Sequence, residues 1–146
     1  MTTSWQSENQ FTGVLSDNEH HWLFKVKRLS KTLAESVKNI YLSKIAQGNE
    51  VLLTEDKQLL RLSETEGHVR LIRHTNGVHN MVLGRTVIPM DTYKHFQEAF
   101  DHLENKSIGE HILFRSHAIT RGEFYIKQFD NDEVQKRFHR NGNCIR

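Results

Sequence analysis

The chain alternates apolar and polar residues most clearly over residues 68–89, HVRLIRHTNGVHNMVLGRTVIP. The alternation is interrupted at Asn76-Gly77. An Asn-Gly pair between two such runs is a strong signal for a two-residue hairpin loop, because both loop positions need a positive φ. The pattern predicts a β-hairpin, and a two-residue loop places Arg70 opposite Leu83.

Two arginines share one face of this predicted hairpin. Side chains alternate between the faces of a strand, so Arg70 and Arg85 lie with Ile72, Met81 and Leu83 on a face that is otherwise apolar. The arginines stand diagonally across the ladder, with about 7–8 Å between their Cα atoms. An arginine there needs an anion or a route to water, because burying an unpaired charge is costly.

Two interpretations of this pair stay open. Arginines at such a spacing suit a small ligand with two carboxylates, each bound by a planar fork of N–H donors. Alternatively, one or both arginines lie at the sheet edge and extend to solvent.

Helical patterns flank the hairpin on both sides. Residues 16–19, Ser-Asp-Asn-Glu, fit a capping box, so a helix is expected to begin there. Its apolar stripe recurs at steps of three and four residues, at Trp22, Val26, Leu29 and Leu33. Two readings of Ser30 stay open: it interrupts this helix, or it caps a second short one. A later helix is capped by Asp91, and its apolar face consists of Phe96, Ala99, Phe100 and Leu103.

Further strands are expected over 37–53, with a break at 47–49, and over 123–129. Residues 54–58 have the composition of a loop, residues 130–133 that of a turn, and a basic tail runs from 136 to 146. Antiparallel strands with a few amphipathic helices indicate an α+β fold.

Composition limits the alternatives. A chain of 146 residues with 36% hydrophobic and 26% charged residues fits a single globular domain, expected over 16–146 after a flexible segment 1–15. Its net charge of +2 gives no reason to expect nucleic acid as a partner. The single cysteine excludes an intrachain disulfide, and neither a leader nor an apolar run of about 20 residues is present. We therefore expect a cytoplasmic monomer without a membrane span, metal or other cofactor.

Several short motifs resemble the chorismate lyase family, the chorismate pyruvate-lyases of ubiquinone biosynthesis. They are Val69-Arg70-Leu71-Ile72, the Asn76-Gly77 turn, the run GRTVIP over 84–89, Ile108-Gly109 and Thr120-Arg121. The run GRTVIP and the arginine fifteen positions before its Arg85 are the most specific. The resemblance extends from about Trp22 to Arg121.

This resemblance implies a single antiparallel sheet with helices to one side, and an internal ligand cavity under helical flaps. The implied reaction converts chorismate to 4-hydroxybenzoate and pyruvate without a cofactor. Arg70 matches the ligand-binding arginine, which takes the ring carboxylate and carries catalysis. Arg85 matches an arginine that binds the second carboxylate or guides the substrate in, and Leu29 and Ile108 match apolar residues that touch the ligand.

One departure from the family concerns a glutamate. The family places it on a final strand, about seven residues beyond a glycine that corresponds to Gly142, where it binds the phenolic hydroxyl of the product. This sequence stops at Arg146. Three readings stay open: the sequence is truncated, Glu50 or Glu123 replaces that glutamate, or the protein binds without turnover.

Two functions therefore remain, a chorismate lyase and a non-catalytic sensor of small acids similar to the effector-binding domains of GntR-type regulators. A carboxylate facing Arg70 favours the enzyme. An amide or apolar group there favours the sensor.

Overall fold

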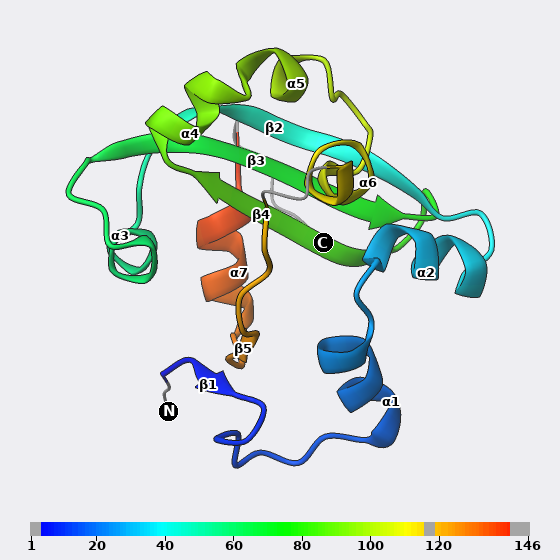
Figure 1. Cartoon of the computed structure of the whole chain (residues 1–146). Coiled ribbons are helices and arrows are strands. Elements are labelled where there is room, and N and C mark those ends of the chain that lie inside the picture. The colour runs from blue at the N-terminus through cyan, green and yellow to red at the C-terminus, as the bar shows by residue number, and fades with distance from the viewer. Residues whose placement is uncertain (1–3, 116–118, 141–146) are drawn as a thin grey trace.

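A three-stranded antiparallel sheet forms the centre of the computed structural model, which describes residues 4–115 and 119–140. The strand order is β2-β3-β4 (Figure 1). The strands are β2 (Tyr41–Val51), β3 (Glu66–Thr75) and β4 (Asn80–Ile88). Together with the surrounding helices, they confirm the predicted α+β class.

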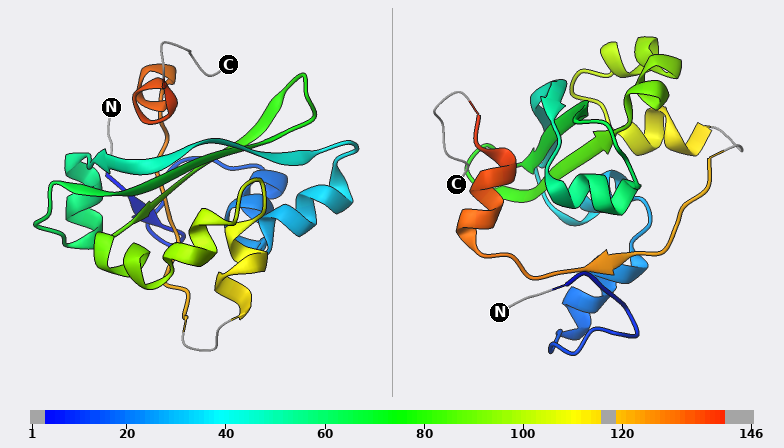
Figure 2. Two further views of the ribbon diagram at one scale, coloured as in Figure 1. Left: turned by 90° about the horizontal axis from the view of Figure 1, so that it is seen from above. Right: turned by 90° about the vertical axis from the view of Figure 1, so that its left-hand side faces the viewer.

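Helices lie on both faces of this sheet, and not to one side only as the resemblance implied (Figure 2). One face, here called the α6 face, carries α2 (Leu29–Ser36), α4 (Met90–His95), α5 (Gln97–Asp101) and α6 (Ile108–His111). The opposite face, here called the α7 face, carries α7 (Asn131–Phe138), which packs on the side of the sheet away from α4, α5 and α6. The remaining helical segments are α1 (Asp17–His20), η1 (His21–Lys25), α3 (Thr54–Leu60) and η2 (Leu113–Arg115).

Each face of the sheet has its own apolar core. On the α6 face, Ile88 packs with four residues of the covering segments, Tyr93, Phe100, Leu103 and Ile112. On the α7 face the buried cluster consists of Leu52, Val69, Leu71 and Phe138. The middle strand β3 has fully buried residues on both faces, Val69 and Leu71 on the α7 face and Arg70 on the α6 face, so its side-chain alternation decides which residues can share a site.

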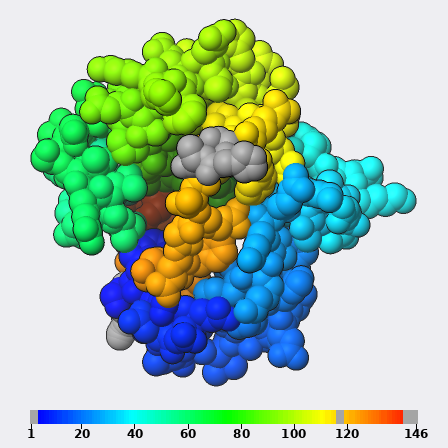
Figure 3. Space-filling model, viewed as in Figure 1, coloured from blue at the N-terminus to red at the C-terminus, as the bar shows by residue number. Residues whose placement is uncertain are grey.

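A small second sheet joins segments that are far apart in the sequence. Strand β1 (Gln6–Ser7) pairs with β5 (Tyr125–Ile126), and the two segments lie side by side in Figure 3. The indole N–H of Trp5 donates to a Glu55 carboxylate oxygen at 2.8 Å. These contacts tie the beginning of the described chain to α3.

The hairpin is present, but its predicted register is wrong. Asn76 does not adopt a positive φ, and its side-chain oxygen instead accepts the N–H groups of Val78 and His79 at 2.9 and 2.8 Å. Four residues therefore separate β3 from β4, and a bulge follows between His74 and Thr75. Arg70 pairs with Thr86, three positions beyond the predicted Leu83.

Two other predictions are wrong for a shared reason. Residues 54–58 and 130–133, expected as loop and turn, begin helices α3 and α7. Asp130 caps α7 by accepting the Glu133 N–H at 2.9 Å, and Phe138 is buried against the sheet. Both segments are short and polar, so packing on the sheet rather than local periodicity stabilises them as helices.

Strand β2 lies within the predicted range 37–53, but the break predicted at 47–49 is wrong, because the strand continues through those residues. Those three residues pair with Arg70, Val69 and His68 of β3. The strand predicted over 123–129 is limited to Tyr125–Ile126, and the part of the basic tail beyond residue 140 lies outside the described residues.

The first helix begins where the sequence predicts. Ser16 Oγ accepts the Glu19 N–H at 3.1 Å, and Glu19 returns the bond to the Ser16 N–H at 3.0 Å. The helix is interrupted, and the interruption lies just before Ser30: the chain leaves the helical conformation at Val26 and resumes it in α2. Among the described residues, no helix is long and apolar enough to cross a membrane.

Candidate functional site

Arg70 is a buried cation at the centre of β3. Its side chain is only 2% exposed and lies on the α6 face. One guanidinium nitrogen donates to Gln47 Oε1 at 2.9 Å, and the other donates to the backbone carbonyls of Glu104 and Lys106 at 2.9 and 2.8 Å. These bonds fix the guanidinium between β2 and the loop that leads into α6.

None of these three acceptors carries a negative charge, and no ion pair to Arg70 is found within 4–115 and 119–140. Burial lowers the pKa of Arg70 from its usual value, and no neighbouring carboxylate opposes that effect. A buried guanidinium stays protonated and is costly without a counter-ion. The arrangement therefore favours an anionic ligand.

A pocket of about 220 Å³ adjoins Arg70. Its floor is the α6 face of the sheet, including Ile72, His74 and Thr86, and its cover includes Leu29 of α2 and Ile108 of α6. We call this cavity the Arg70 pocket. It is mainly apolar and suits a ligand about the size of one six-membered ring.

Three of the four residues proposed from the sequence meet in this pocket: Leu29, Arg70 and Ile108. Arg85 does not. The change of register by three residues is odd, so it moves Arg85 to a position opposite Leu71 on the α7 face. The prediction that the two arginines share a face is therefore wrong, and Arg85 is not part of the Arg70 pocket.

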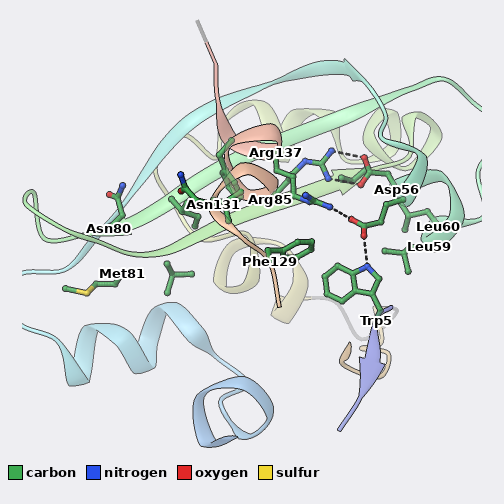
Figure 4. A pocket seen from close by; sticks show the side chains of 16 residues that line it. Trp5, Asp56, Leu59, Leu60, Asn80, Met81, Arg85, Phe129, Asn131 and Arg137 are labelled. Atoms are coloured by element: carbon green, nitrogen blue, oxygen red, sulfur yellow. Dashed lines mark hydrogen bonds and ion pairs between the residues drawn. The ribbon is translucent and has the colours of Figure 1, made fainter. Parts of the chain in front are cut away.

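Arg85 instead forms a buried ion pair with Asp56 of α3. Its two terminal nitrogens each donate to one carboxylate oxygen at 2.7 Å, in the fork geometry visible in Figure 4. Burial opposes ionisation of Asp56, but hydrogen bonds from Arg85 and the Leu53 N–H outweigh it and lower the pKa of that carboxyl. The pair borders a separate cleft of about 770 Å³ that also contains Trp5 and Arg137.

An ion pair closes the cover of the Arg70 pocket. Arg28, just before α2, forms a bidentate salt bridge with Glu110 of α6. Its Nε donates to Glu110 Oε1 at 2.9 Å, and a terminal nitrogen donates to Oε2. The guanidinium groups of Arg28 and Arg121 lie 5.4 and 5.6 Å from the centroid of the Phe114 ring. We call the pair of Arg28 and Glu110 the clasp.

Removing the clasp is expected to speed ligand release a few-fold. Arg28 and Glu110 are 49% and 28% exposed at their side chains, so solvent screens the interaction and its contribution is modest. With 4-hydroxybenzoate as the probe, chosen because the resemblance to chorismate lyases implies it as a ligand, the Glu110→Gln variant should show a faster dissociation rate by stopped-flow fluorescence. Glu35→Gln, on the exposed side of α2, is a matched control that should leave the rate unchanged.

Two buried histidines on the same face as Arg70 make stability depend on pH. Burial lowers the pKa of His74, and it also lowers that of His68 against the opposing effect of Asp101 and Glu50. In the unfolded chain these histidines take up protons near pH 6.5, whereas in the folded protein they do so only at lower pH. The contribution of the two neutral histidines to the free energy of unfolding is therefore fully present above about pH 6.5 and declines as the pH falls below that value.

We expect the unfolding temperature to fall between pH 7.5 and 5.5, and to fall less in a His74→Leu variant, as measured by circular dichroism. The exposed His79 provides the control, because His79→Gln should leave the pH dependence as it is. Equal slopes in the wild type and the His74→Leu protein would contradict the assignment.

Sequence reasoning missed His74, Gln47 and the clasp. His74 is four residues from Arg70 on one strand, so the side-chain alternation could have placed both on the same face. Arg28 and Glu110 are far apart in the sequence, and only the tertiary fold brings them together. No group of three or more His, Cys, Asp or Glu residues able to hold a metal is found in the described part of the chain.

The fold and the Arg70 pocket define an α+β protein with a small, buried, cationic cavity. The chain belongs to the chorismate lyase family, whose sequence model matches residues 1–143. No curated protein and no solved structure matches it significantly.

Proposed function

We propose that this protein is a chorismate lyase that converts chorismate to 4-hydroxybenzoate and pyruvate in the Arg70 pocket. The observation that carries the proposal is a buried arginine, without an anionic partner among the described residues, in a pocket of single-ring size. Membership of the chorismate lyase family supports the same substrate.

The reaction makes limited chemical demands on the protein. The C–O bond between the ring and the enolpyruvyl group breaks, and the neighbouring ring carbon loses a hydrogen. The departing group gains that hydrogen and becomes pyruvate, while the ring becomes aromatic. No electron acceptor is consumed. The protein's part is to orient the substrate and to stabilise charge as it moves onto the leaving group.

In this proposal Arg70 binds the ring carboxylate, because its guanidinium supplies charge and directional N–H donors. Leu29 and Ile108 contact the ring from the two covering helices, and burial of apolar surface favours that position. The clasp keeps water out during the reaction. Arg85 acts on this pocket only through the stability of the sheet.

The experiment that tests the proposal is to incubate the purified chain with chorismate and to follow 4-hydroxybenzoate by chromatography. Formation of 4-hydroxybenzoate and pyruvate in equal amounts, above the spontaneous decay measured without protein, is the expected result. Absence of product from folded protein would contradict the lyase assignment.

A second candidate function is a sensor that binds an aromatic acid without turnover. The specific observation in its favour is that Arg70 faces the Gln47 amide and two backbone carbonyls rather than a carboxylate. Saturable binding of 4-hydroxybenzoate without conversion of chorismate would support it.

A further inference from the structure

His74 lies in the floor of the Arg70 pocket, and no hydrogen bond to its ring is found in the part of the chain that the structure describes. It follows Arg70 by four positions on β3 and therefore points to the same α6 face. Its neighbours across the sheet are Leu42 on β2 and Val82 on β4, which offer no side-chain hydrogen bond. The sheet thus places a polar ring in apolar surroundings.

The His74 ring has no hydrogen-bond partner among the described residues. His74 is 4% exposed, no hydrogen bond to it is found in residues 4–115 or 119–140, and its ring nitrogens are not among the fully buried unpaired side-chain atoms, so they remain accessible at the lining of the pocket. The neighbouring histidine on the same face, His68, does not line this pocket; its Nδ1 lies 3.0 Å from Asn49 Oδ1, and its Nε2 is buried and unpaired among the described residues. Leaving a buried polar group unpaired destabilises a protein, so a pocket that retains one favours a ligand that pairs with it.

Burial keeps the His74 ring neutral near pH 7, because it lowers the pKa. A neutral imidazole has one N–H donor and one bare nitrogen acceptor. A hydroxyl group is its natural complement, since it both donates and accepts. A carboxylate is a poorer match for two reasons. It can only accept a hydrogen bond, and a neutral ring offers no positive charge to pair with it.

The spacing along the strand fits a ligand with a carboxylate at one end and a hydroxyl at the other. Four residues of β3 span about 13 Å at about 3.3 Å per residue. A six-membered ring with substituents at opposite positions, extended by a hydrogen bond of about 3 Å at each end, covers such a span. Ile72 stands between the two polar residues and provides an apolar floor for the ring.

We infer that His74 is the specificity-determining residue that hydrogen-bonds the hydroxyl group opposite the ligand's carboxylate. The inference rests on the proposed function, in which that hydroxyl belongs to chorismate and then to 4-hydroxybenzoate. In this role His74 selects hydroxylated acids over acids that lack the hydroxyl.

Calorimetric titration of the full chain with 4-hydroxybenzoate and with benzoate tests the inference. The wild-type protein should bind 4-hydroxybenzoate about tenfold more tightly than benzoate. His74→Leu should lose that preference, with weaker binding of 4-hydroxybenzoate and benzoate affinity changed less than about twofold. His74→Gln, which keeps a donor and an acceptor, should retain part of the preference.

His79→Gln on the exposed hairpin loop is the matched control and should bind both acids like the wild type. An unchanged preference in His74→Leu would overturn the role of His74, even where the wild type converts chorismate and the proposed function stands. A wild-type protein that binds neither acid and forms no product would overturn both.

Discussion

Replacing Arg70 by glutamine is expected to abolish chorismate turnover and to weaken 4-hydroxybenzoate binding by at least about thirtyfold. Removing one member of a buried, hydrogen-bonded charge pair costs about 2–5 kcal/mol of binding free energy. Arg70 has no anionic partner among the described residues, so the carboxylate of the bound acid is the counter-ion of this buried guanidinium. Calorimetric titration and product chromatography measure the two effects.

Arg73 supplies a matched control for this experiment. It lies on the same strand three residues further on, where the side-chain alternation directs it to the α7 face. Arg73→Gln removes the same charge from β3 but leaves the Arg70 pocket intact, so turnover should stay within about twofold of the wild type. Equal losses in both variants would indicate a general effect of charge or folding, which circular dichroism would reveal.

Local signals in the sequence predict the elements that depend on local chemistry. The Ser16 capping box and the hairpin around Asn76 are correct because side-chain hydrogen bonds within a few residues decide them. Their exact geometry is less predictable. Asn76 uses its side chain to hold two backbone N–H groups, which lengthens the loop and changes the register of β4.

This error of register explains why the candidate site was only partly predictable. Leu29, Arg70 and Ile108 were assigned by resemblance to family motifs and meet in one pocket whatever the register of β4. The face on which Arg85 lies depends on that register. A shift by an odd number of residues places Arg85 on the opposite face of the sheet, where it binds Asp56. Helix α3, which supplies Asp56, has too little apolar periodicity to be recognised, because contacts with the sheet stabilise it.

Replacing Asp56 by leucine is expected to lower the free energy of unfolding by about 3–5 kcal/mol, because it leaves the Arg85 guanidinium buried without a partner. The two side chains are only 6% and 11% exposed, so water cannot compensate for the lost carboxylate. The substitution also removes the acceptor of the Leu53 N–H at the start of α3. Urea denaturation followed by circular dichroism measures the loss.

The double variant Asp56→Leu/Arg85→Met distinguishes a structural ion pair from a ligand site. Replacing both charges removes the unpaired guanidinium and should restore most of the lost stability, leaving about 1 kcal/mol for the missing helix cap. Because the pKa of Asp56 is lowered in the folded protein, the pair stabilises fully above about pH 4 and less as the pH falls through the folded pKa. The stability difference between wild type and Asp56→Leu should therefore narrow in acid. A stable double variant that no longer binds 4-hydroxybenzoate would instead show that Arg85 contacts the ligand, whereas retained binding assigns it to the architecture of the sheet.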